Sequence, residues 1–383
     1  MTSNLPTLLV DIKPGVIDLG WGHPSSRLHP FNEVSEASSR MFSKGDNSAL
    51  QYGATQGYGP FLESLASFLS DQKAYLPDVD PHNLFLTAGA SQALDLAATM
   101  YADSGDTVIV EEPTYFVIEK IFREHSLNIV GIPTDEDGMD TEALQEVLEK
   151  GLTPKFLYTI PTFQNPTASS LTEQRREHLV ALANQYNFQI FADEVYQLIY
   201  FHQKPPRPMM YFDSGNRVIS FGSFSKILAP GLRTGWIHAS REVVGKLSDA
   251  ALTFSGGGFN HYASALIKEV IDLGHLKSNV EKLKAEYLSR ALVMDKSLQE
   301  YFGTSVSYSF PKGGYYFWLK FPSGFDSDSF LQLAEEHGVS FRPGNAFSES
   351  GKFGRYLRLT YTLFESDEIR EGVKRLAKAY KNT

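Results

Sequence analysis

Short apolar runs alternate with segments of helical periodicity between about residues 60 and 240. Such runs, rich in Val, Ile, Leu and Phe, are typical of strands that are buried on both faces of a sheet. The segments between them predict helices, and two of these begin at Thr141 and Thr172, which we expect to be N-caps. The predicted strands cover residues 83–87, 107–111, 128–132, 155–160, 188–193 and 217–221.

The alternation of strands with helices predicts an α/β fold, because parallel strands need crossover connections that are usually helical. We expect three layers, with a mostly parallel central sheet between helices. After a long polar helix near residues 275–300, shorter strands alternate with helices at 326–337 and 366–380. The predicted boundaries give a large domain at 46–285 and a smaller α+β domain at 1–45 and 286–383.

Composition narrows the classes of function. The chain has 383 residues, of which 42% are hydrophobic and 21% charged, an ordinary globular balance. A net charge of −10 and a pI of about 5.5 argue against a nucleic-acid partner bound on a basic surface. No apolar run approaches the roughly 18 residues of a membrane span, and the N-terminal segment does not have the pattern of a secretory signal.

Cysteine is absent from the chain, which excludes disulfides, thiolate nucleophiles and cysteine-ligated metals. This composition fits a cytoplasmic protein. The ten histidines have no paired metal-ligand spacing, so no metal site is predicted.

Polar residues follow the predicted strands, at the edge where open parallel sheets bind ligands. After the strand at 83–87, Ser91 and Gln92 open a helix whose free N–H groups could bind an anion, although Ser91 could also be only an N-cap. Tyr115 follows the next strand. Its ring could stack on a planar ligand or simply pack in the core or on the surface.

Asn165 and Asp193 follow two further strands. Asn165 precedes a proline, which holds its backbone in an extended or turn conformation, and the Asn-Pro pair could also be only a turn. Asp193 closes an otherwise apolar strand, where a carboxylate needs a cationic partner. A ligand or a structural salt bridge could supply that cation. Tyr196 lies three positions further along the chain.

The last predicted strand runs into the stretch "SFGSFSKILAPGLRTGW" at residues 220–236. Ser223 and Ser225 precede Lys226, and Arg233 follows beyond a Pro-Gly turn. The stretch contains no acidic residue, so its cations are placed to bind an anion from outside the chain.

The groups at these strand ends complement the parts of one kind of molecule. Hydroxyls, helix N–H groups and an arginine suit a phosphate, and Tyr115 suits the face of a ring. Asn165 and Tyr196 suit a phenolic oxygen. Asp193 suits a protonated ring nitrogen, and Lys226 suits a carbonyl carbon.

These motifs resemble the class I/II aminotransferases, fold-type I enzymes that depend on pyridoxal 5'-phosphate (PLP). The string S-x-S-K-x-x-x-P-G-x-R-x-G-W at residues 223–236 is highly specific, and the resemblance covers nearly the whole chain. It is nearest to the branch that contains kynurenine and 2-aminoadipate aminotransferases. The other matching segments are, in order, "LGWGHPSSRLHP", "LQYGATQGYGPFLESLASFL", "LTAGASQALDL", "EEPTYF", "PTFQNPTA", "ADEVYQLIYF" and "YLRLTYT".

The resemblance implies that Lys226, Asp193 and Tyr196 form the catalytic set. Lys226 would form a Schiff base with PLP and move a proton between the substrate and the cofactor. Asp193 would keep the ring nitrogen protonated, so that the ring acts as an electron sink. Asn165 and Tyr196 would bond the ring hydroxyl, and Tyr115 would stack on the ring. The implied phosphate ligands are Ser91, Gln92, Ser223, Ser225 and Arg233.

The resemblance also implies residues for the partner chain and the substrate. Tyr52 matches a tyrosine that reaches the phosphate of the neighbouring subunit, which predicts a homodimer. Gly22, in the family's G-x-P segment, and Asn165 would bind the substrate. Arg358 matches the arginine that binds the substrate carboxylate, and strand alternation independently turns it away from the apolar row of its strand.

Departures from the family pattern leave the substrate open. The usual arginine of the second block is absent, and Glu63 and Ser64 stand in that region. The run Gly256–Gly258 could shape a substrate pocket or be only a flexible turn. The expected reaction is transamination between an α-amino acid, such as an aromatic or long aliphatic one, and a 2-oxo acid. The alternatives are a PLP-dependent lyase, decarboxylase or cyclising enzyme, and a non-catalytic ligand sensor.

Overall fold

The computed structural model describes residues 7–382, which form two compact units. The larger unit comprises Arg27–Ala285 and Lys312–Gly314. The smaller unit comprises Glu286–Pro311 and the described residues of Met1–Ser26 and Tyr315–Thr383. One boundary between the units falls inside helix α10, His275–Phe302.

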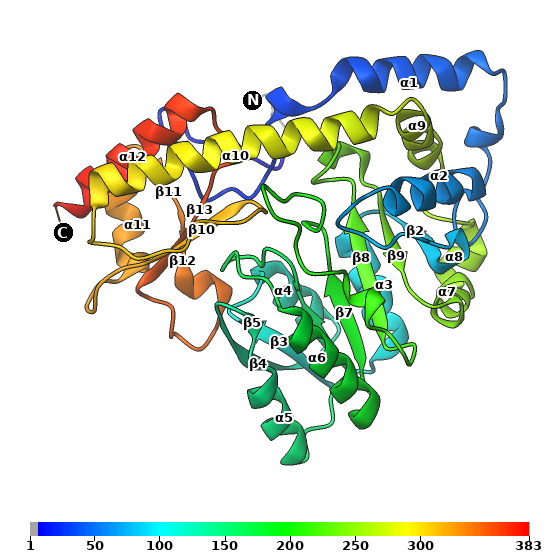
Figure 1. Ribbon diagram of the computed structural model, residues 1–383, viewed down its shortest axis with the longest axis horizontal. Helices are drawn as coiled ribbons and strands as arrows, with labels where there is room; N and C mark the ends of the chain where they lie inside the picture. The colour runs from blue at the N-terminus through cyan, green and yellow to red at the C-terminus, as the bar shows by residue number, and fades with distance from the viewer. Residues whose placement is uncertain (1–6, 383) are drawn as a thin grey trace, which may run out of the picture. The chain divides into compact units, whose positions relative to one another are not determined.

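An eight-stranded sheet forms the centre of the larger unit (Figure 1), in the order β2-β9-β8-β7-β6-β3-β4-β5. Its middle strands, from β8 to β4, are parallel, whereas β2, β9 and β5 pair antiparallel. The strands are β2 (Leu84–Thr87), β3 (Thr107–Glu112), β4 (Asn128–Asp135), β5 (Gly138–Met139), β6 (Phe156–Thr159), β7 (Gln189–Asp193), β8 (Val218–Ser223) and β9 (Gly235–His238). All the strands predicted here are present, and the mostly parallel α/β sheet is confirmed.

Helices form the outer layers of this unit. They are α1 (Phe31–Ser43), α2 (Gly59–Ser70), α3 (Ala90–Tyr101), α4 (Phe116–Glu124), α5 (Thr141–Glu149), α6 (Glu173–Tyr186), α7 (Arg241–Ser248), α8 (Ala251–Gly256) and α9 (His261–Asp272). Thr172 caps α6 as expected, because its side chain accepts from the N–H of Arg175. The expectation for Thr141 is wrong. Asp140 caps α5, since its carboxylate accepts two N–H groups of the first turn at 3.1 Å each.

Side chains alternate strictly between the two faces of the sheet near its carboxyl edge. Phe156 and Tyr158 of β6 contact Phe122 of α4, whereas Leu157 belongs to the apolar core formed with α5 and α6. On β7, Phe191 stacks on Phe156 with ring centroids 4.1 Å apart, and its neighbours along the strand belong to the α5–α6 core. The side chains of consecutive residues at the end of a strand therefore point to opposite faces of the sheet.

Helix α1 groups with the larger unit, although the sequence interpretation assigned residues 1–45 to the smaller domain. It packs against α9, where Arg40 donates to the buried Glu269 at 3.0 Å and Lys44 binds the same carboxylate. These ion pairs and the amphipathic face of α1 explain the grouping of residues 27–45. The division into functional domains stays a prediction.

The smaller unit contains a three-stranded antiparallel sheet in the order β10-β13-β12 and a short parallel pair, β1 with β11. The helices expected at 326–337 and 366–380 are α11 and α12. The elements are β1 (Ile17–Asp18), β10 (Tyr316–Lys320), α11 (Ser327–Glu336), β11 (Val339–Ser340), β12 (Arg342–Pro343), β13 (Tyr356–Thr360) and α12 (Ser366–Tyr380).

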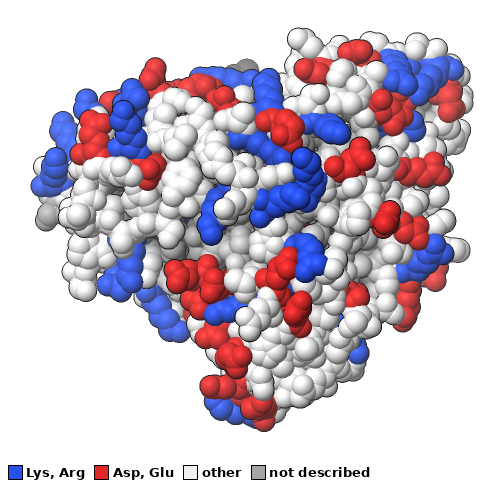
Figure 2. Space-filling model, viewed as in Figure 1, with Lys and Arg blue, Asp and Glu red and all other residues white. Residues whose placement is uncertain are grey.

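Charged side chains of both signs are mixed over the face shown in Figure 2, where acidic residues border a central group of lysines and arginines. Within residues 7–382, no helix has the length and apolarity that crossing a bilayer requires.

Candidate active site

Lys226 lies in the turn that follows β8, close to two other residues of the predicted catalytic set. Its Nζ is 5.9 Å from the centroid of the Tyr196 ring, and this tyrosine is buried. Burial raises the pKa of Asp193, at the end of the neighbouring strand β7, and the charge of Lys226 opposes this rise. The larger unit thus brings Lys226, Tyr196 and Asp193 together.

The carboxylate of Asp193 is only partly satisfied by the protein. Its Oδ2 accepts a hydrogen bond of 2.7 Å from the hydroxyl of Tyr158, on β6. Its Oδ1 is buried, and no residue between 7 and 382 offers it a hydrogen bond. Burial raises the pKa of Asp193 to about 6, although the bonds from Tyr158 and from the backbone N–H of Val195 and the charge of Lys226 all act in the opposite direction. Such an acceptor fits the protonated ring nitrogen of PLP better than a structural salt bridge.

The N-terminus of α3 forms one side of an anion site. The helix begins after Gly89, whose φ of 94° is favourable only for glycine, so Gly89 rather than Ser91 is the N-cap residue. Ser91 is the second helical residue and is exposed, in the first turn, where backbone N–H groups have no partner within the helix. The side chain of Gln92 turns back and accepts from the N–H of Ala88 at 3.0 Å.

Arg233 and two serines form the other side of this anion site. Ser223 accepts from the N–H of Ser225 at 3.1 Å, and Arg233 reaches the Ser225 hydroxyl at 3.5 Å. A Cβ atom on Gly89 would lie 2.9 Å from Nη2 of Arg233, so the guanidinium sits directly against the glycine. A helix N-terminus, two hydroxyls and a guanidinium at one place suit a phosphate dianion.

Asn260 fixes the turn that carries Arg233. Its side-chain amide donates to the carbonyl oxygens of Leu232 and Arg233 and to the hydroxyl of Thr234. The sequence interpretation missed this residue, because nothing local relates it to the turn nearly thirty residues earlier.

The glycine run before Asn260 has a packing role. A Cβ on Gly257 would lie 2.2 Å from the carbonyl oxygen of Gly53, and one on Gly258 would lie 2.2 Å from that of Ala54. These glycines therefore allow close approach to the loop that follows Tyr52. Tyr52 itself is 87% exposed.

Tyr115 and Asn165 lie in the loops after β3 and β6. Tyr115 is the half-buried N-cap residue of α4, and Asn165 is buried. The two loops are connected, because the side chain of Gln164 donates to the carbonyl oxygen of Pro113 at 2.7 Å.

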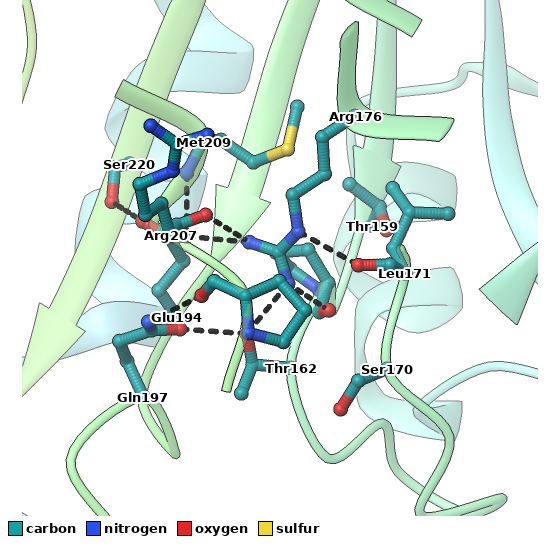
Figure 3. A network of polar contacts seen from close by, with 12 residues as sticks. Thr159, Thr162, Ser170, Leu171, Arg176, Glu194, Gln197, Arg207, Met209 and Ser220 are labelled. Carbon is teal, nitrogen blue, oxygen red and sulfur yellow. Dashed lines mark hydrogen bonds and ion pairs between the residues drawn. The ribbon is translucent and has the colours of Figure 1, made fainter. Parts of the chain in front are cut away.

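A buried ion pair supports these loops from the α6 face of the sheet (Figure 3). Arg176 of α6 is fully buried, and its Nη1 lies 3.6 Å from Oε1 of Glu194, the residue after Asp193. Glu194 also accepts from the N–H of Met209 at 2.9 Å and from the hydroxyl of Ser220 at 2.5 Å. Burial lowers the pKa of Arg176 to about 10 and raises the pKa of Glu194, and each charge opposes the change in the other.

Arg176 also satisfies the irregular backbone around it. It donates to the carbonyl oxygens of Leu171, Arg207 and Pro161 and to the hydroxyl of Thr162. Thr162 in turn donates to Gln197 at 2.6 Å, which ties the loop of Asn165 to the loop of Tyr196. The sequence interpretation missed this network, because its members are distant along the chain.

The substrate residues predicted in the smaller unit also lie together. Arg358 is buried, donates to the carbonyl oxygen of Gly20 at 2.6 Å, and lies 4.2 Å from the centroid of the Tyr316 ring. A Cβ on Gly22 would lie 2.3 Å from the hydroxyl of Tyr316, so only glycine fits beside that ring. Within residues 7–382, no group of three or more His, Cys, Asp or Glu side chains could hold a metal ion.

Comparison with known proteins defines the class of this chain. Residues 14–376 match the family "Aminotransferase class I and II". The chain is 35% identical over 370 residues to aromatic-amino-acid aminotransferase 1 of Thermococcus litoralis, covering 96% of this chain and 88% of that protein.

Solved structures agree with this match. Kynurenine aminotransferase of Pyrococcus horikoshii, solved in complex with PMP, superposes with a TM-score of 0.89 at 32% identity, covering 96% of this chain and 91% of that one. The α-aminoadipate aminotransferase of Thermus thermophilus, complexed with N-(5'-phosphopyridoxyl)-L-leucine, gives a TM-score of 0.86 at 31% identity, covering 96% and 93%.

The chain belongs to the class I and II aminotransferase family. It is a PLP-dependent enzyme that transaminates amino acids, and the relatives agree with the branch predicted from the sequence. None of these findings favours the lyase or decarboxylase alternative.

Gly89→Ala should weaken phosphate binding, because the added methyl group displaces the guanidinium of Arg233. We expect the dissociation constants of PLP and of inorganic phosphate each to rise about tenfold or more, measured by titration of the cofactor-free protein. Gly151→Ala is the matched control, since Gly151 also has a positive φ (98°) but nothing within 4 Å of its Cβ position. If the dissociation constants rose equally in both variants, backbone strain and not displacement of Arg233 would be the cause of the weaker binding.

Asp193→Asn should stabilise the cofactor-free protein at pH 8 but not at pH 4. The pKa of Asp193 is raised from 3.8 to about 6 in the folded state, so folding becomes less favourable as pH rises between these values and the full cost applies above 6. We expect a gain of about 1–3 kcal/mol in the free energy of unfolding at pH 8, measured with urea. Asp78→Asn, at an exposed carboxylate, is the control. A loss of stability at both pH values would contradict the analysis.

Proposed function

We propose that the residues around Lys226 carry out this transamination, with amino acids that have aromatic or long side chains as substrates. The observation that carries the proposal is the buried Oδ1 of Asp193, which has no hydrogen-bond partner among residues 7–382. Burial raises the pKa of this carboxylate to about 6, and the charge of Lys226 only partly opposes the rise. A protonated ring nitrogen satisfies this oxygen and keeps Asp193 ionised.

When bound, PLP supplies an electron sink for the negative charge that develops at the substrate Cα. Lys226 holds the cofactor and then accepts and returns the proton of that carbon. Asn165 and Tyr196 orient the ring oxygen, and Tyr115 covers one face of the ring.

The phosphate of the cofactor is assigned to the anion site at the start of α3. Backbone N–H groups at Ser91 and Gln92 would share it with Ser223, Ser225 and Arg233. The close contact of Arg233 with Gly89 supports this role, because it holds the guanidinium beside the helix N-terminus.

The substrate class is inferred from the relatives and from Arg358. The relatives named above act on aromatic amino acids, kynurenine and α-aminoadipate, which share long side chains. Arg358 would bind the substrate carboxylate with two parallel hydrogen bonds, with Gly22 nearby. The guanidinium is preoriented for such a bond by Gly20 and the Tyr316 ring.

A homodimer is the proposed functional unit. Tyr52 (87% exposed) lies in a loop and Phe254 (77%) in helix α8, and the two segments meet where Gly257, directly after α8, lies against Gly53. Exposed aromatic residues on a connected surface suit a second copy of the chain. Tyr52 would then reach the phosphate bound by the partner subunit. A cytoplasmic location and a biosynthetic role stay predictions.

Lys226→Ala should abolish covalent capture of PLP, because Lys226 is the amine assigned to this bond. Borohydride treatment followed by mass spectrometry should show one cofactor per chain in the wild type and none in the variant. Lys150→Ala, at an exposed lysine, should behave as the wild type. Individual amino acids should convert the cofactor spectrum of the wild type, and a 2-oxo acid should reverse it, fastest for aromatic or long-chain substrates. Capture in Lys226→Ala, or release of ammonia or carbon dioxide instead of reversal, would refute the proposal.

Mixing two inactive variants should restore activity if Tyr52 acts across a homodimer. Tyr52→Ala and Lys226→Ala chains, unfolded and refolded together, form hybrid dimers in which one site has both residues intact. Random pairing predicts about a quarter of the wild-type activity, since half the dimers are hybrids with one complete site each. Separate refolding of each variant is the control. No recovery in the mixture, with dimers confirmed by light scattering, would exclude the intersubunit role.

A further inference from the structure

The buried side chain of Gln164 connects two loops of the proposed site. It is 1% exposed, and its Nε2 donates to the carbonyl oxygen of Pro113 at 2.7 Å and to Oε2 of Glu111 at 3.2 Å. Its Oε1 accepts from the N–H of Thr167 at 2.9 Å and from the Thr167 hydroxyl at 2.8 Å. These bonds use both donors and both acceptor positions of the amide, so the side chain has one orientation.

Glu111 anchors this amide at the end of β3. Its carboxylate is buried and accepts from the hydroxyl of Thr159 at 2.6 Å and from the N–H of Ile160 at 3.1 Å, as well as from Gln164. Strands β3 and β6 are direct neighbours, with Val110 opposite Tyr158. Glu111 therefore fixes the end of β6 and the amide of Gln164 at the same time.

The two loops joined in this way carry different contacts of the proposed cofactor site. Pro113 is two residues before Tyr115, and Gln164 directly precedes Asn165. Tyr115 is assigned to the face of the ring, and Asn165 to the ring oxygen. Because at most one residue separates each of these hydrogen-bonded positions from the neighbouring contact residue, the backbone has little freedom to separate Tyr115 from Asn165.

We propose that Gln164, anchored by Glu111, is a positioning residue that holds Tyr115 and Asn165 in register on the cofactor ring. The inference rests on the proposed function, which assigns these two residues to the ring. Gln164 acts on the ring only, because its bonds do not involve the anion site formed by α3, Ser225 and Arg233.

The charges near Glu111 are compatible with this role. Burial raises the pKa of Glu111 to about 7, and the negative charge of Asp193 from β7 adds to this increase. The other charged or titratable groups around it are Tyr158 of β6 and Arg176 of α6, both of which interact with its charge. A carboxylate keeps both oxygens available as acceptors, whereas a protonated one gives up part of that capacity.

The test is Gln164→Met, which keeps the volume but removes all four hydrogen bonds. We expect the dissociation constant of PLP to rise about tenfold while that of inorganic phosphate stays unchanged. The apparent pKa of the bound cofactor's visible absorption should rise by about half a unit to one unit, since a misplaced Asn165 stabilises the ring oxygen less. Thr167→Val, which removes one bond to Gln164, should shift both quantities in the same direction by a smaller amount.

Thr253→Val is the matched control for the loss of a buried polar group. Its hydroxyl is buried and bonds only carbonyl oxygens near α7 and α8, so its loss should lower stability without changing either affinity. Unchanged PLP affinity and absorption in folded Gln164→Met would overturn the inference. Equal weakening of PLP and phosphate would also overturn it, because that result indicates general loss of structure. A wild-type protein that binds neither ligand would instead refute the proposed function.

Discussion

Asp193 must stay ionised at a place where burial favours its neutral form. The hydroxyl of Tyr158 and the backbone N–H of Val195 act on this carboxylate, but its Oδ1 has no hydrogen-bond partner in the described chain. The charge of Lys226 offsets part of the cost, but the pKa still rises to about 6. A well-satisfied carboxylate would be more stable but would leave no acceptor for a protonated ring. The incomplete satisfaction of this group therefore accounts both for the proposed binding of a cationic ring and for the lower stability expected without it.

Strand alternation keeps this carboxylate separate from the one beside it. Asp193 points to the α4 face with Tyr158, whereas Glu194 points to the α6 face and binds Arg176. An arginine on the α4 face, placed like Arg176 on the α6 face, would form a permanent ion pair with Asp193. A register shift of one residue would exchange the two carboxylates. The core packed between the sheet and α6 opposes such a shift, because Ile190 and Ala192 would have to leave it.

The nearness of Lys226 to Asp193 could be predicted from the sequence, because the parallel strands β7 and β8 that precede them end at one edge of the sheet. The supporting residues could not. Tyr158 lies in a continuous apolar run, where nothing distinguishes it from Leu157 until the register with β7 is known. The grouping of residues 27–45 with the larger unit could not be predicted for a similar reason, since the contact of α1 with α9 joins segments more than two hundred residues apart.

The side chains of the candidate site lie on loops. These loops hold a fixed position only if their buried backbone carbonyl groups accept hydrogen bonds. A loop cannot satisfy its own carbonyls as a strand does, and buried ones need donors from elsewhere. Here the donors are long side chains with several N–H groups. Arg176 serves three carbonyls, Gln197 serves those of Ala74 and Pro206, and Asn260 serves two more beside Arg233.

Each of these donors links segments that are separate in the sequence, so each fixes the position of one loop relative to another. Such loops can therefore be as well defined as the strands they follow, while their functional side chains stay available for a ligand. The buried amides and guanidinium do not touch the reacting atoms. They position the residues proposed to contact the cofactor, so that these residues keep the spacing that a planar ring requires.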